Sequence, residues 1–229
     1  MAEFRFYGSG LPDVRVEDLQ GKLIVVEGTD GVGRSTQVDL LRRWLEQRGH
    51  AVFDTGLTRS SLAGKGLKRA KEGNTLSLIT FTLFYATDFA DRLENQIIPA
   101  LRAGFIVLTD RYIYSQIARA MVRGADEAWA RDVFSIALVP TAIYYLKADL
   151  AHLIPRVAFN RGFNYWESGM DMNLGRDMYE SFCRYQQRML DTFDRMAEYY
   201  GFGVVDANGP ADAVFERLKR RLRRVLDGR

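Results

Sequence analysis

Short apolar runs alternate along this chain with longer segments in which apolar residues recur at helical spacing. The runs have the length of buried strands and lie at residues 23–26, 51–54, 105–109, 142–146 and 202–206. The first connection between runs is long enough for a parallel crossover. The alternation predicts an α/β fold, with three layers (α/β/α) built around a five-stranded parallel sheet.

The segments between the runs predict the helices. They lie at residues 34–48, 65–71, 76–102, 113–139 (two short helices), 150–160, 176–200 and 211–226. Pro99 is expected to bend or break the long third segment, and Pro155 to lie early in 150–160 or to kink it. Residues 1–21 predict an irregular lead-in, followed by one domain over 22–229.

Composition and charge narrow the class of protein. Of 229 residues, 47% are hydrophobic and 27% charged, with a net charge of +3, as is ordinary for a soluble globular domain. No apolar run is long enough to span a bilayer, and residues 1–20 contain no signal-type stretch. Cys183 is the only cysteine, which favours a reducing, cytoplasmic setting. Membrane association is not expected, and the basic residues at 217–224 favour a solvated helix face over a nucleic-acid patch.

The stretch EGTDGVGRST at residues 27–36 carries the clearest chemistry. It follows an apolar strand, precedes an amphipathic helix, and matches the phosphate-binding pattern G-x-x-x-x-G-K-[ST] except at one position. Glycines permit the tight turn, and backbone N–H groups at the following helix start attract an anion. Arg34 stands where the pattern has lysine, and keeps the charge with a different geometry. The stretch predicts a nucleotide-phosphate site; the alternative is a glycine-rich turn without a ligand.

Two further groups of residues are candidates for the same site. Asp110 and Arg111 follow the third apolar run, and ligands bind at this edge of a parallel sheet. A structural salt bridge is the alternative for this pair. Phe84, Tyr85 and Phe89 lie near one face of the long third segment, where an aromatic stripe serves either the core or a ligand.

These motifs together resemble thymidylate kinases, in the P-loop nucleoside monophosphate kinase group. The resemblance covers roughly residues 22–226 and is strongest at EGTDGVGRSTQ (27–37) and DRYIYSQIA (110–118). Arg59-Ser60-Ser61, the PAL..G segment at 99–104 and VVDA at 204–207 support it. It implies a P-loop NTPase fold and transfer of the ATP γ-phosphoryl group to a nucleoside monophosphate, dTMP first, by a cytoplasmic homodimer that serves nucleotide biosynthesis.

The resemblance also implies roles for individual residues. ATP would be held by Gly28, Asp30, Gly31, Val32, Gly33, Arg34, Ser35, Thr36 and Arg156. The acceptor would contact Asp30, Arg59, Tyr85, Phe89, Arg92, Arg111 and Ser115. Mg²⁺ would bind Ser35 and Asp110, and catalysis would depend on Arg34, Asp110 and Arg161. Residues at about 160–172, rich in Gly and Asn, would form a mobile lid.

The chain departs from the family pattern at several of these positions. Arg34 replaces the loop lysine, and Phe89 stands where a helix arginine is expected, with Arg92 nearly one turn further on. Ala118-Arg119-Ala120 replaces Ala-Tyr-Gln, and a second lid arginine is replaced around Tyr165-Trp166. Four hypotheses therefore remain: a dTMP kinase, a related kinase with another phosphorylated acceptor, a nucleotide-binding protein without catalysis, and a nucleic-acid-dependent ATPase.

Overall fold

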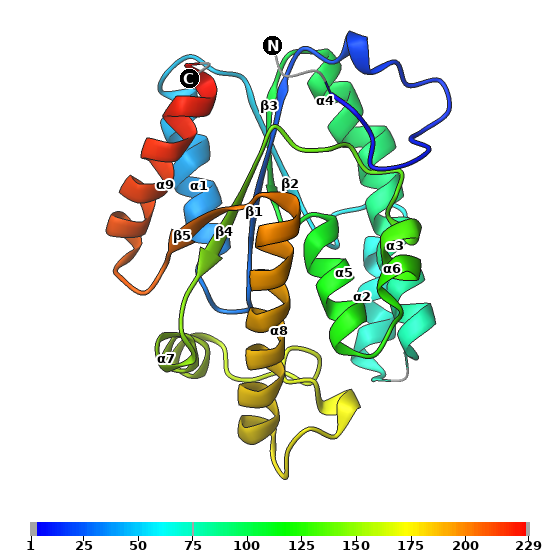
Figure 1. The fold of residues 1–229 in the computed structure, drawn as a ribbon, viewed down its shortest axis with the longest axis vertical. Helices are drawn as coiled ribbons and strands as arrows, with labels where there is room; N and C mark the ends of the chain where they lie inside the picture. Colours follow the sequence, from blue (N-terminus) through cyan, green and yellow to red (C-terminus); the bar gives the residue numbers. More distant parts are fainter. Residues whose placement is uncertain (1–3, 75, 228–229) are drawn as a thin grey trace.

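Five parallel strands form one sheet at the centre of the computed structural model, which describes residues 4–74 and 76–227. The strands are β1 (Lys22–Gly28), β2 (Val52–Gly56), β3 (Ile106–Asp110), β4 (Ala142–Lys147) and β5 (Gly203–Asp206), in the order β2-β3-β1-β4-β5. The predicted α/β fold is confirmed. The two outer strands join to the centre by crossovers that carry helices on both faces (Figure 1).

The central position of β1 follows from its sequence. Leu23, Ile24, Val25 and Val26 are 0% exposed, because β3 and β4 flank this strand and helices cover both of its faces. A strand buried on both faces reads as a continuous apolar run rather than an alternating one. The apolar run therefore predicts that these residues form a strand and also that this strand lies at the centre of the sheet.

Helices cover the two faces of the sheet in separate layers. α1 (Arg34–Glu46) and α9 (Ala211–Leu226) contact each other, with α1 against β2 and β3 and α9 against β5. α5 (Ile113–Val122) contacts β1 on the other side, together with α4 (Ile98–Arg102) and α8 (Met178–Tyr200). The remaining helices are α2 (Gly64–Glu72), α3 (Leu78–Arg92), α6 (Glu127–Val133) and α7 (Leu150–Asn160).

The long third segment is interrupted close to Pro99, as predicted. The helix changes type earlier, in the π-helical turn η2 (Leu93–Ile97), and Pro99 lies in the first turn of α4. The helical backbone is continuous across this junction, and the π turn just before Pro99 is the change in hydrogen bonding that accompanies a residue without an N–H. Residues 150–160 form α7 as predicted, and Pro155 lies in its middle rather than in its first turn.

Residues 4–21 are more ordered in their contacts than an irregular lead-in implies. Phe6 bridges to Leu138, the backbone N–H of Tyr7 donates to Ala137, and Val16–Asp18 forms a 3₁₀ turn. The Tyr7 hydroxyl also lies 2.6 Å from that of Tyr114 on α5. Hydrogen bonds therefore attach this segment to the helical layer that contains α5 and α6.

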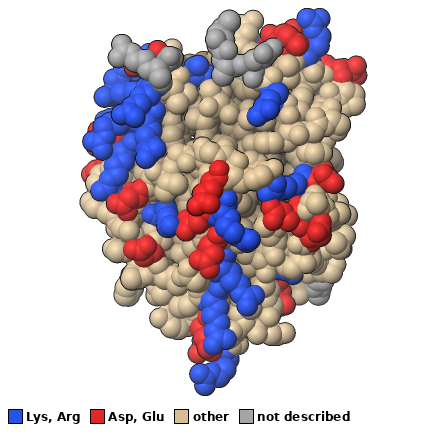
Figure 2. Space-filling model, in the orientation of Figure 1, with Lys and Arg blue, Asp and Glu red and all other residues tan. Residues whose placement is uncertain are grey.

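Charge is unevenly spread over the surface. Figure 2 shows lysines and arginines gathered over α9. Arg217, Arg220, Arg221 and Arg224 line a depression between α9 and β5, so the basic cluster lies on an accessible helix face. None of the helices among residues 4–74 and 76–227 is long and apolar enough to cross a bilayer.

Candidate nucleotide-binding site

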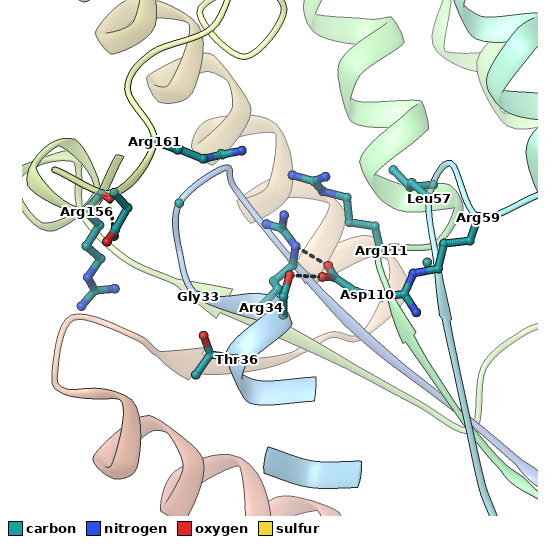
Figure 3. Close-up of a pocket in the computed structure, with 13 residues that line it drawn as sticks. Gly33, Arg34, Thr36, Leu57, Arg59, Asp110, Arg111, Arg156 and Arg161 are labelled. Atoms are coloured by element: carbon teal, nitrogen blue, oxygen red, sulfur yellow. Dashed lines mark hydrogen bonds and ion pairs between the residues drawn. The ribbon is translucent and has the colours of Figure 1, made fainter. Parts of the chain in front are cut away.

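A polar cleft of about 390 Å³ lies at the carboxyl ends of β1, β2 and β3. Register brings these ends together, because Asp110 at the end of β3 pairs with Val26 of β1 and Gly56 of β2. Cleft-lining residues come from four loops or helix ends (Figure 3): Gly31, Gly33, Arg34, Ser35, Thr36, Gly56, Leu57, Arg59, Asp110, Arg111, Arg156, Asn160 and Arg161.

The glycine-rich loop has the conformation that its sequence predicts. Gly31 and Gly33 have φ angles of 84° and 96°, in the region that side chains disfavour. A Cβ atom on Gly31 would lie 2.3 Å from Cγ2 of Val157, so a side chain there would clash with α7. Gly33 forms the N-cap of α1, and residues 33–36 line the cleft, so the positive end of this helix lies at the cleft.

Arg34 is the first residue of α1, next to the loop, and is only 7% exposed. Its Nη1 donates to the carbonyl oxygen of Gly28 at 2.5 Å and to that of Thr29, while Nε donates to Asp110 at 2.9 Å. The guanidinium therefore bridges β1 and β3 across the mouth of the loop (Figure 3). A lysine ammonium has three N–H donors on a single nitrogen, so it could not place donors at both the Nε and the Nη1 positions that Arg34 uses here.

Asp110 joins the loop to the third strand. Its Oδ1 accepts from Arg34 and its Oδ2 accepts from the Ser35 hydroxyl at 2.6 Å. Burial alone would raise the pKa of this carboxyl, but Arg34 and Arg111 outweigh burial and hold the pKa below its usual value. Asp110 is therefore ionised at neutral pH, as a ligand to a hard cation must be.

Three arginines reach the cleft from its rim (Figure 3). Arg59 pairs with Asp54 at 2.8 Å and is half exposed, and Arg161 makes a two-pronged pair with Glu167. Arg156 instead donates to the carbonyl oxygens of residues 207, 208 and 209, at 2.9–3.1 Å. Arg156 thus fixes the loop after β5 beside the cleft.

Asp30 is the most heavily paired acid of the site. Its carboxylate accepts from Arg111, from Arg119 at 3.2 and 3.3 Å, and from the Gln186 amide at 3.4 Å. The side chain is 2% exposed. Burial would raise the pKa of Asp30, but Arg111 and Arg119 outweigh it and hold the pKa well below its usual value.

The structure places several predicted acceptor-binding residues outside this cleft. Phe89 is 1% exposed and packs edge-on against Tyr112 and Phe134, so it belongs to the core. Arg92 is fully buried and donates to Asp88, which also accepts from the backbone of residues 58 and 60. The Asp88–Arg92 pair therefore holds the loop that carries Arg59, and does not line the cleft.

Ser115 supports the site from below. Its hydroxyl donates to Glu27 at 2.5 Å, and the same carboxyl accepts from the backbone N–H groups of Tyr112 and Ser115. Glu27 is 0% exposed, and this burial raises its pKa despite the three donors. These contacts hold the chain after Arg111, whose φ of 70° is unusual for a side chain of this size.

Tyr85 lies in a small apolar cluster beyond the cleft. Its ring meets Phe81 edge-on, and Trp166 stacks on Phe81 with 4.8 Å between ring centroids. The Trp166 indole N–H donates to the carbonyl oxygen of Lys71, and the Trp166 side chain is buried. Trp166 thus covers Phe81, the aromatic neighbour of Tyr85, which is the one residue of this cluster that the resemblance assigns to the acceptor.

Sequence reasoning missed Arg119 and Glu27 as parts of the site. A charged residue at the end of an otherwise apolar strand was a usable signal for Glu27. Arg119 was visible as a departure from the family pattern, but its ion pair with Asp30 joins residues 89 positions apart. Only packing of α5 against β1 brings the two together.

Comparison with known proteins gives consistent matches. A family model described as thymidylate kinase matches residues 26–218. A probable thymidylate kinase 2 from Saccharolobus solfataricus is 35% identical over 211 residues, covering 91% of this chain and 99% of that protein. A thymidylate kinase from Clavibacter sepedonicus is 33% identical over 211 residues, covering 89% and 95% of the two chains.

Proposed function

The chain belongs to the thymidylate kinase family, and from this premise we propose that it transfers the γ-phosphoryl group of ATP to dTMP, giving dTDP and ADP. The observation that carries the proposal is the cleft, where a phosphate-binding loop faces arginines from two other strand ends. Phosphoryl transfer needs two anions held in line with their charge neutralised, and asks little covalent chemistry of the protein.

The donor end of the cleft is the loop itself. We assign the ATP phosphates to the backbone of residues 28–36, with Arg34, Ser35 and Thr36 at the start of α1. Arg34 would exchange its bonds to the loop carbonyls for bonds to phosphate oxygens while keeping Asp110. Arg156 and Arg161 would flank the donor from α7 and its C-terminal end.

The acceptor end is formed by Arg59 and Arg111. They follow β2 and β3, which are neighbours in the sheet, so both reach the same edge. Two guanidinium groups can neutralise a phosphate dianion through paired hydrogen bonds. The attacking oxygen of that phosphate is already ionised, so no protein side chain need remove a proton.

Mg²⁺ suits the oxygen atoms of Ser35 and Asp110. No group of three or more acidic, His or Cys side chains that could enclose a metal occurs within residues 4–74 and 76–227. This fits Mg²⁺ in such sites, which takes one or two protein oxygens and completes its shell with phosphates and water. When bound, the ion would neutralise charge on the transferring phosphoryl group.

A phosphoryl-transfer assay with Mg-ATP tests the proposal across dTMP, dUMP, dCMP and the other nucleoside monophosphates. We expect dTMP to be the best acceptor, and Arg59→Ala to raise its KM far more than that of ATP. Another acceptor in first place would favour the second candidate, a related kinase. Trp166 over the aromatic cluster and Arg119 beside Asp30 are the observations that favour this second candidate.

The family also supports two statements about the whole molecule. We propose a homodimer, for which the apolar side chains exposed on α3 offer a contact face. We propose a cytoplasmic location, in keeping with the lone Cys183.

If the protein bound ATP but phosphorylated none of the nucleoside monophosphates, the hypothesis of a nucleotide-binding protein without catalysis would be favoured.

A further inference from the structure

Asp30 is shared by two arginines that differ in their access to the cleft. The Arg111 guanidinium donates to Oδ1, and Nη2 of Arg119 lies within 3.3 Å of both oxygens. Arg111 lines the cleft, whereas neither Arg119 nor Asp30 belongs to its lining. Arg119 therefore stands behind the carboxylate, while Arg111 lies between the carboxylate and the space where an acceptor phosphate would bind.

This arrangement sets a charge problem for acceptor binding. Arg111 must donate N–H groups to the acceptor phosphate, yet its guanidinium is already paired with Asp30. A carboxylate as buried as Asp30 resists losing its counterion, because water cannot replace the partner. With a single arginine, Asp30 would compete with the phosphate for Arg111.

We propose that Arg119 is a positioning residue for the acceptor, acting as the standing counterion of Asp30 so that Arg111 can turn to the acceptor phosphate. The inference rests on the proposed function, in which Arg111 binds that phosphate. Burial would lower the pKa of Arg119, but Asp30 reverses this effect and raises it, so the counterion stays charged.

Neighbouring groups cannot replace Arg119 in this role. The Gln186 amide is neutral, lies 3.4 Å from Asp30, and donates to the carbonyl oxygen of Glu167 at 2.8 Å. Arg123, the residue that caps the C-terminus of α5, is held by Asp171, by the Tyr185 hydroxyl and by the carbonyl oxygen of Trp166. Arg34 and Arg161 also lower the pKa of Asp30, but they pair with Asp110 and Glu167. Among the described residues, the ion pairs of Asp30 are with Arg111 and Arg119.

The test is Arg119→Met, measured by steady-state kinetics with dTMP, dUMP and dCMP in turn. We expect the KM of each acceptor to rise about tenfold, a change of about 1.4 kcal/mol in binding, with the KM of ATP little changed. Arg119→Lys should restore most of the loss, since it returns the charge. Arg123→Met removes a buried arginine at the C-terminal end of α5 and should leave the acceptor KM nearly as it was.

Two results would overturn the inference. An unchanged acceptor KM would mean that Arg111 serves Asp30 and the phosphate together. A loss that differs strongly among the three bases would make Arg119 a residue that reads the nucleoside.

A second measurement covers the case in which Arg119→Met folds poorly. Asp30→Asn removes the buried carboxylate, so Arg119→Met added to it should leave dTMP affinity, measured by calorimetry without ATP, unchanged. An additional loss in the double variant would contradict the role through Asp30. Turnover of dTMP by the unaltered protein tests the proposed function separately, because calorimetry requires only that the acceptor binds. If dTMP did not bind to the unaltered protein, the inference would be overturned.

Discussion

At the scale of single residues, Arg34 shows what an arginine can do at the lysine position of a phosphate-binding loop. A planar group with several donors can hold two loop carbonyls and Asp110 together, as it does here. The same planarity limits how the group can follow a phosphate that moves during transfer. Arg34 therefore combines a structural task with the proposed catalytic one.

Arg34→Ala should lower kcat by about 10²–10³, the usual cost of removing one positioned donor in phosphoryl or acyl transfer. The kcat of Arg34→Lys should lie between that of Arg34→Ala and that of the natural protein, because the positive charge is kept and the contact with Asp110 is weakened. Steady-state kinetics check both, with Arg43→Ala on the exposed side of α1 as the control. Normal turnover by Arg34→Ala would leave Arg34 a structural role alone.

Asp30 also controls how stability depends on pH. Its folded-state pKa lies far below the unfolded value of 3.8, so its contribution is complete above that pH and is lost as the pH falls below it. Asp30→Asn should cost about 3 kcal/mol of unfolding free energy at pH 7, since two arginines lose their counterion. It should also flatten the loss of stability below about pH 4.

Urea unfolding at pH 7, 5 and 3 measures this difference. Asp194→Asn serves as the control, because its ion pair with Lys147 is about 40% exposed on both sides and should contribute little. If the unfolding free energy of Asp30→Asn and of the natural protein fell equally between pH 5 and pH 3, Asp30 would not be a source of the acid sensitivity.

At the scale of elements, the two parts of the segment at 160–172 differ in how many contacts hold them to the rest of the fold. Residues 166–168 are tied to α2 and α8, through Trp166 to Lys71, Glu167 to Gln186 and Ser168 to Ser181. Arg161 is held through its exposed pair with Glu167. We therefore expect the proposed lid to be confined to the first part of the segment, because residues 166–168 are anchored to α2 and α8.

A non-hydrolysable ATP analogue should slow hydrogen exchange mainly at residues 160–164. Trp166→Ala should speed exchange across 165–172 even without nucleotide, because the stacking on Phe81 and the bond to Lys71 are lost. Phe159→Ala, whose ring is 90% exposed on α7, is the matched control. Uniform protection by the analogue over all of 160–172 would restore the whole segment as the lid.

At the scale of the whole molecule, α3 presents a face that the single chain does not cover. Ile79 and Leu83 are 50% and 47% exposed and lie one turn apart on this helix. Exposed apolar side chains that are neighbours on one helix are typical of a surface that packs against a second copy.

Leu83→Asp should convert the proposed homodimer to a monomer, because a charge would be buried at the contact. Light scattering coupled to size-exclusion chromatography measures the mass, and Phe159→Asp on α7 is the control for a new surface charge. A natural protein that is monomeric would contradict the homodimer itself. A dimer that survives Leu83→Asp would move the contact to another face.

The sequence by itself determined the fold and the position of the cleft. Apolar runs predicted all five strands within one or two residues, and the glycine loop predicted the conformation at residues 31 and 33. These features depend on local chemistry: which residues suit a buried strand, and which backbone angles a side chain forbids. The three strand ends then lie together because parallel strands bring their carboxyl ends to one edge.

The tertiary structure alone decided which polar groups meet. Arg92 and Ser115 were indistinguishable in the sequence from ligand contacts, yet they hold Asp88 and Glu27 beneath the site. Arg119 reaches Asp30 only because α5 packs on β1, and Trp166 covers α3 only because its segment folds back onto it. Such pairings join residues far apart in the chain, and their energy comes from burial and geometry that no local pattern of residues records.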